Sequence, residues 1–357
     1  MRILDNRSVV KRYDRSGMLG SIESLALQCQ QAWDDTRHII VPPAFRRVRH
    51  IVINAMGGSA LGADVIRTVF QDRLPLPLIL TNQYTVPKFV DRDTLYIVSS
   101  YSGTTEEITA SIAPAVRARA KLMIICAGGT LARYARQHKI PAYIFTPRFN
   151  PSQQPRMAVG YSVAGILGLL CQAGLLKITQ SEFNQVIRQI VMAHASLGIA
   201  RPTVRNVAKQ TAQAVHGRVP VIIAAEHLSG IAHVMANQVN ENSKAFSNFF
   251  LISEMNHHLM EGLRFPRSNK RNLGFIFLES RSYHPRNQRR FAITQRVLTR
   301  AGIPFVRYQV KGPTVFAEAM QALTFSGYVG FYGALLNKID PSPIPVVDYF
   351  KKELSRS

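Results

Sequence analysis

The chain has 357 residues, 46% of them hydrophobic, and its 44 Lys and Arg against 21 Asp and Glu give a formal net charge of +23. This length allows about two domains with sizeable cores. The cysteines, Cys29, Cys126 and Cys171, have no CxxC spacing, which argues against a disulfide framework or a thiolate zinc site and indicates a cytoplasmic protein. The positive charge attracts anions, but without a recognition helix or interleaved aromatic residues it indicates incidental rather than specific binding of nucleic acid.

The first 150 residues predict a parallel sheet covered by helices. A helix-like stretch from Ser21 to His38 ends before Pro42 and Pro43. Short apolar runs then alternate with segments of helical length, and this alternation is typical of a parallel sheet with helices on both faces. The predicted strands are 50–55, 77–81, 94–99, 121–126 and 141–145.

The segment from Met157 to Leu176 contains no charged residue and is about as long as a membrane span. It also contains Tyr161, Ser162, Gln172 and four glycines, which favour a helix buried in protein. With a second helix near 180–199 it forms a predicted connector over residues 151–200, and we expect no membrane contact.

A second alternating set follows the connector. Strands are predicted at 219–224, 249–253, 274–278 and 304–310, and helices near 228–242, 256–263, 285–302 and 314–337. The chain is therefore predicted to be an α/β protein with two doubly wound parallel sheets, in domains of residues 1–150 and 201–357 joined by the helical connector.

Two loops rich in glycine and hydroxyl groups follow predicted strands of the first sheet. One spans Met56 to Gly62, and the other spans Ser99 to Glu107. Glycine lets the backbone approach a ligand closely, and hydroxyl groups at the start of a helix suit a phosphate ester. The second loop also has the pattern of a capping box, so it alone leaves helix capping open. The pair of loops favours a ligand site at the carboxyl edge of the sheet.

Five short motifs in one order carry a resemblance to a known family. They are Met-Gly-Gly-Ser at 56–59, Ser-Tyr-Ser-Gly with Thr-Glu-Glu at 100–107, Pro-Arg at 155–156, Asn-Glu-Asn-x-Lys at 240–244 and Glu-Met-Asn-His-His at 254–258. Together they resemble the bifunctional phosphoglucose/phosphomannose isomerases, whose two flavodoxin-like domains are of the sugar isomerase (SIS) type. Residues 340–354 resemble the closing helix of that family.

The resemblance implies an isomerase that interconverts glucose 6-phosphate and fructose 6-phosphate, and mannose 6-phosphate as well, through a cis-enediol. It assigns the base to Glu241, whose pKa we expect burial to raise, and sugar-ring opening to His257. It places Arg156 over the enediolate. Lys351 is the site lysine from the closing helix, unless Lys352 is the aligned residue. In this family the histidine can reach the site from a neighbouring subunit, so a homodimer is expected.

The same resemblance assigns the substrate-binding residues: Ser100, Ser102 and Thr105 hold the phosphate, and Gly57, Gly58 and Ser59 line the sugar side. Thr104 stands where the family usually has asparagine. Two structural alternatives remain open: Glu241 pairs only with Lys244 on one helix face, and Arg156 only binds loop carbonyls.

Two other functions are open: a sugar-phosphate sensor without turnover and an aminosugar-phosphate isomerase. The sequence has no HExxH motif or carboxylate cluster with metal-ligand spacing, and the loop after the first strand does not match GxGxxG. No metal and no nicotinamide or other cofactor is therefore expected, and the partners are a hexose 6-phosphate and a second subunit.

Overall fold

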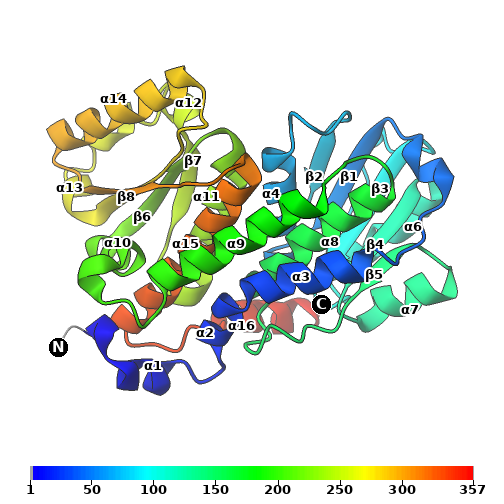
Figure 1. The fold of residues 1–357 in the computed structure, drawn as a ribbon, viewed down its shortest axis with the longest axis horizontal. Coiled ribbons are helices and arrows are strands. Elements are labelled where there is room, and N and C mark those ends of the chain that lie inside the picture. The colour runs from blue at the N-terminus through cyan, green and yellow to red at the C-terminus, as the bar shows by residue number, and fades with distance from the viewer. Residues whose placement is uncertain (1–2, 357) are drawn as a thin grey trace.

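The computed structural model describes residues 3–356, which form two parallel α/β domains side by side with helices packed between them (Figure 1). The first sheet has the order β2-β1-β3-β4-β5 and the second the order β7-β6-β8-β9. All strand pairs are parallel. The predicted fold class is confirmed.

The first sheet consists of β1 (His50–Ala55), β2 (Leu78–Thr81), β3 (Thr94–Ser100), β4 (Lys121–Cys126) and β5 (Ala142–Ile144). Every residue of β3 is buried, because helices cover both faces of the sheet. The covering helices include α4 (Gly58–Val69), α5 (Glu106–Ala110), α6 (Ile112–Arg117) and α7 (Gly129–Gln137). The chain leaves β1 toward β2 and returns to β3 on the other side, so the order of the strands reverses between β1 and β3.

The second sheet consists of β6 (Val219–Ala224), β7 (Asn248–Leu251), β8 (Leu273–Glu279) and β9 (Phe305–Gln309). Its strand order reverses between β6 and β8. The helices of this half are α10 (Val207–Val215), α11 (Ser229–Gln238), α12 (Ile252–Met255), α13 (Asn269–Asn272), α14 (Pro285–Ala301) and α15 (Val315–Leu336).

The two halves meet through close helix packing. Helix α8 (Val159–Gln172) packs against α4 and α3 (Leu25–Thr36), while α11 packs against α4 across the boundary. A Cβ atom on Gly230 would lie 2.6 Å from the carbonyl oxygen of Asp64, so only glycine allows α11 to approach α4 this closely. At its other end α11 reaches the beginning of α4 through Arg156, because Gln238 donates to the backbone oxygen of Arg156 and a Cβ atom on Gly58 would lie 2.6 Å from the backbone nitrogen of Arg156.

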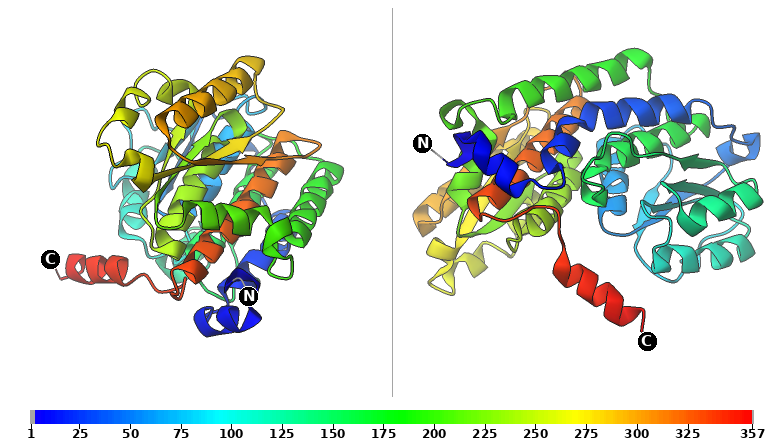
Figure 2. Two further views of the ribbon diagram at one scale, coloured as in Figure 1. Left: turned by 90° about the vertical axis from the view of Figure 1, so that its left-hand side faces the viewer. Right: turned by 90° about the horizontal axis from the view of Figure 1, so that it is seen from below.

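The remaining helices complete the connector and the two ends of the chain. Helix α9 (Gln180–Leu197) packs on α15, as do α1 (Arg7–Tyr13) and α2 (Met18–Glu23). Helix α16 (Pro345–Leu354) has no buried residue and projects from the body of the molecule (Figure 2). Within residues 3–356 no helix combines the length and apolar character that a membrane crossing needs, and α8 is a buried helix as predicted.

One predicted helix was wrong, and two other predicted elements differ in their bounds. The helix predicted near 256–263 is a turn followed by a short 3-10 helix (Glu261–Arg264), because Asn256, His257, His258 and Gly262 have low helix propensity. The strand predicted at 249–253 ends at Leu251. Its last residues begin α12, in which Ile252 and Met255 are buried at helical spacing. The helix predicted from Ser21 to His38 is divided into α2 and α3 at Ser24.

Candidate active site

The first loop of the predicted site turns sharply after β1. Gly57 has a φ of +49°, a conformation that L side chains rarely adopt. Gly58 begins α4, and a Cβ atom there would lie 2.6 Å from the backbone nitrogen of Arg156. Ser59 Oγ accepts a hydrogen bond of 2.9 Å from the N–H of Tyr101. Ser59 therefore joins this loop to the loop after β3.

The second loop gathers the three predicted phosphate ligands. The hydroxyl oxygens of Ser100 and Thr105 are 2.7 Å apart, and those of Ser100 and Ser102 are 3.5 Å apart. Thr105 is the N-cap of α5, but its side chain makes no capping hydrogen bond. The capping box is therefore absent here. We name the group formed by Gly57, Gly58, Ser59, Ser100, Ser102 and Thr105 the hydroxyl cradle.

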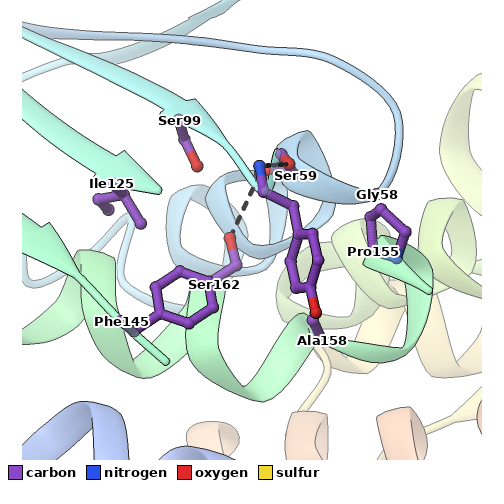
Figure 3. A pocket seen from close by; sticks show the side chains of 9 residues that line it. Gly58, Ser59, Ser99, Ile125, Phe145, Pro155, Ala158 and Ser162 are labelled. Atoms are coloured by element: carbon purple, nitrogen blue, oxygen red, sulfur yellow. Dashed lines mark hydrogen bonds between the residues drawn. The ribbon is translucent and has the colours of Figure 1, made fainter. Parts of the chain in front are cut away.

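A small pocket lies directly behind the hydroxyl cradle (Figure 3). Gly58 and Ser59 line one side of it, and Phe145 and Ser162 line another. Ser162 Oγ donates a hydrogen bond of 3.3 Å to the carbonyl oxygen of Ser59, which fixes the first turn of α4 against α8. The cradle thus rests on a packed support rather than on a loose loop.

Glu241 lies in a single π-helical turn, Val239–Ser243, that continues α11. Such π-turns occur frequently at functional sites. The turn ends at Lys244, which has a φ of +54°. The Glu241 side chain is 24% exposed, and its Oε2 lies 3.1 Å from Nη1 of Arg156. The predicted base is therefore partly buried and held by the predicted cation.

Arg156 is buried, with 1% of its surface exposed, and all five of its guanidinium N–H donors are engaged. Nε donates to Asn242 at 2.5 Å, and Nη1 donates to Gln154 at 2.7 Å and to Glu241. Nη2 donates to the backbone oxygens of residues 341 and 342, both at 2.8 Å. Desolvation lowers the pKa of Arg156, and Glu241 opposes this effect. Arg156 therefore binds loop carbonyls, as the structural alternative expects, but not these alone, because it also pairs with Glu241.

This saturation bears on the predicted contact between Arg156 and an enediolate. A reacting oxygen would have to replace Gln154 or Glu241 on Nη1, because the other donors hold Asn242 and the loop at 341–342. The contacts as they stand position Glu241. The backbone nitrogen of Arg156 packs against Gly58, so Arg156 lies between the predicted base and the hydroxyl cradle.

Lys244 does not pair with the Glu241 carboxylate. Its Nζ donates to the backbone oxygen of Glu241 and, at 2.9 Å, to the backbone oxygen of Pro341. Partial burial, with the nearby charge of Arg156, lowers the pKa of Lys244 to about 8. Gln154, Asn242 and Lys244 were not predicted as site residues. Asn242 and Lys244 belong to the motif at 240–244, whereas no sequence signal marks Gln154.

The other two predicted catalytic residues lie elsewhere in this chain. His257 is exposed in the turn after α12, and its backbone N–H donates to the backbone oxygen of Glu254 at 3.0 Å. Lys351 is exposed on the projecting helix α16. Among residues 3–356, no hydrogen bond or ion pair joins either residue to Glu241 or Arg156, and no group of His, Cys, Asp and Glu is arranged to hold a metal ion.

The chain is similar in sequence to known proteins over most of its length. Residues 204–354 match the model of the bacterial phospho-glucose isomerase C-terminal SIS domain. A bifunctional phosphoglucose/phosphomannose isomerase from Caldicellulosiruptor bescii is 28% identical over 95% of this chain and 99% of its own length. The enzyme of the same name from Aquifex aeolicus is 25% identical over 92% of this chain and 95% of its own length.

Solved structures share the fold. A hypothetical protein from Thermus thermophilus superposes with a TM-score of 0.74 at 17% identity, over 99% of this chain and 93% of that one. A putative phosphosugar isomerase from Silicibacter pomeroyi has a TM-score of 0.65 at 14% identity, over 91% of this chain and 99% of its own. The domain match covers only residues 204–354, whereas the relatives of one name are similar over nearly the whole length, so the chain is similar throughout to the bifunctional phosphoglucose/phosphomannose isomerases.

Proposed function

We propose that the protein isomerises hexose 6-phosphates, interconverting glucose 6-phosphate and mannose 6-phosphate with fructose 6-phosphate. The observation that carries the proposal is the Glu241 carboxylate, held at 3.1 Å by a buried arginine that also contacts the loop of the hydroxyl cradle. The relatives named as phosphoglucose/phosphomannose isomerases, 25% and 28% identical over most of this chain, support the same reaction.

In the proposed mechanism the hydroxyl cradle binds the phosphate and Glu241 moves one proton. Glu241 takes the proton from C2 of the open-chain aldose, the electron pair of that bond forms the C1=C2 double bond, and the former carbonyl oxygen O1 takes up a proton to give the cis-enediol. In the second half O2 releases its proton to solvent and becomes the ketone oxygen. The same carboxyl group returns a proton to C1, so that C2 is oxidised and C1 is reduced within one molecule. This step needs no external oxidant or cofactor. Arg156 holds the carboxylate in place and contributes positive charge beside the developing enediolate.

The proposal extends to the assembly. His257 and Lys351 are exposed, and neither is bonded to Glu241 within the described residues of one chain. Both lie in segments with exposed apolar residues: Leu251 and Phe265 flank His257, and Tyr349 and Phe350 accompany Lys351. These features support a homodimer in which such residues act at a site of the neighbouring subunit. A cytoplasmic location and the domain boundaries 1–150, 151–200 and 201–357 belong to the same proposal.

The sensor and aminosugar alternatives are weaker. A sensor needs no proton-transfer base, yet a π-turn, a buried arginine and Lys244 all contribute to the placement of Glu241. An aminosugar-phosphate isomerase would use the same cradle, so the substrate series in the assay distinguishes it.

The test is a coupled assay of purified protein with glucose 6-phosphate, mannose 6-phosphate and glucosamine 6-phosphate. We expect turnover of the first two, and a fall in kcat of about 10²- to 10⁴-fold in Glu241→Gln with fructose 6-phosphate still bound. Asp72→Asn, which changes an exposed carboxylate in the turn after α4, is the control and should keep full activity. Wild-type kcat in Glu241→Gln would refute the base.

A further inference from the structure

The second sheet has an edge built like the edge that carries the hydroxyl cradle. In both sheets the strand order reverses between the two strands concerned, β1 and β3 in the first and β6 and β8 in the second. The backbone turns in the same way after the first strand of each pair: Gly57 and Glu226, each two residues beyond its strand, have φ values of +49° and +47°. Ligands of doubly wound sheets bind at this position.

The loops after β3 and β8 also share a pattern of hydroxyl groups. Ser100 and Ser102 stand at the end of β3, and Ser280 and Ser282 follow β8 with the same spacing. The likeness between the two sheet edges ends at the next loop along each sheet. After β4 the chain supplies Gly128 and Gly129, which carry no side chain, whereas after β9 it enters α15, whose first turn carries Glu318.

Glu318 occupies the second edge with its carboxylate. Ser280 Oγ donates to Oε2 at 2.6 Å, and Ser282 Oγ donates to Oε1 at 3.2 Å. Nε2 of His227 lies 2.9 Å from Oε2. The side chains of Glu318 and His227 are only 5% and 6% exposed. Two hydroxyl groups and an imidazole thus converge on one buried anionic group.

We propose that the loops after β6 and β8 form a second oxyanion cradle, whose donors would bind inorganic phosphate or a phosphate monoester and which the Glu318 carboxylate keeps closed. The surroundings suit an anion, because Arg281 and His284 follow in the same loop, Arg286 lies in the first turn of α14, and all three are exposed. The closed cradle leaves each chain with a single phosphosugar site, the hydroxyl cradle of the first sheet.

The test removes the carboxylate of Glu318 by substitution and measures phosphate binding by titration calorimetry at fixed ionic strength. Glu318→Ala and Glu318→Ser should each bind a phosphate ion that the wild-type protein does not bind. Glu318→Gln keeps the volume of the side chain and should bind no more phosphate than the wild-type protein. Asp72→Asn also removes one negative charge, so it controls for general attraction of phosphate to a basic protein.

A second measurement covers the case in which the variants are less stable. Phosphate should then raise the melting temperature of Glu318→Ala more than that of the wild-type protein, since a ligand stabilises only the state that binds it. The additional binding should disappear when Ser280→Ala is combined with Glu318→Ala. Folded Glu318→Ala and Glu318→Ser that bind no more phosphate than the wild-type protein would overturn the proposal. Neither outcome depends on whether the protein is an isomerase.

Discussion

The carboxyl edges of the two sheets start from the same backbone plan and end with opposite contents. At the first edge glycine takes the positive-φ position, and three hydroxyl groups bond only among themselves and to their own loop. At the second edge Glu226 takes that position, and Glu318 uses the hydroxyl groups as internal partners. An internal carboxylate such as that of Glu318 can therefore satisfy the donors of a phosphate cradle and convert a binding edge into a structural one.

The ion pair between Arg156 and Glu241 belongs to neither edge alone, because its two residues come from different halves of the chain. The arginine comes from the segment before α8 and the glutamate from the π-turn after α11, so the proposed base of one half is held by an arginine that packs against the cradle of the other. The contacts of Arg156 connect residues 85, 86, 185 and 186 positions apart in the chain.

The largest effect is expected from Arg156→Met. Removing one partner of a buried ion pair costs about 3–5 kcal/mol, because the remaining polar groups lose their partner without regaining water. The expected result is this loss of unfolding free energy in urea titrations, together with loss of isomerase turnover. The matched control is Arg73→Met, which breaks the exposed pair with Glu182 at 42% and 31% side-chain exposure and should cost less than about 1 kcal/mol. Equal losses in the two variants would contradict the assigned role.

An effect of intermediate size is expected from Gly57→Ala at the first edge, and none on activity from the corresponding change at the second edge. Gly57→Ala places a side chain at a φ of +49° with no atom within 4 Å, so it should cost about 1–3 kcal/mol through backbone strain alone. It should also raise KM for the sugar phosphate, because the cradle loop shifts. Glu226→Gly, at the corresponding position of the second sheet, relieves strain but removes the contacts of Glu226 with His284 and Asn287. Its kcat and KM should equal those of the wild-type protein.

The smallest effect is expected in the pH dependence of the unfolding free energy, to which Lys244 contributes. Its folded pKa of about 8 lies below its ordinary value of 10.5, so the unfolded chain binds more protons between these values. The cost of holding this ammonium group is therefore present below pH 8 and is relieved as the pH rises toward 10.5. Relative to Lys244→Gln, the wild-type protein should gain unfolding free energy between about pH 8 and pH 10. A difference that stays constant with pH would show that the group is not perturbed.

Much of the fold follows from local sequence patterns. The apolar runs placed all nine strands of residues 3–356 to within a few residues. The signal is clearest for β1, β3, β4, β6 and β8, which are buried almost throughout and read as continuous apolar segments. The hydroxyl residues of the cradle were also predictable, because they directly follow strands whose carboxyl ends must meet at one edge. The predicted helix near 256–263 failed because sheet packing ends there and the local residues favour turns.

Amino-acid order alone therefore determined the parallel sheets and the two loops after β1 and β3, whereas Glu241 and Arg156 were predicted only through the resemblance to a known family. Only the tertiary structure decided that all the donors of Arg156 are used, that Lys244 binds backbone rather than carboxylate, and that Glu318 fills the second edge. The physical reason is separation along the chain. Local periodicity reports which face of a segment is buried, whereas a buried polar side chain finds its partners wherever folding brings donors and acceptors together.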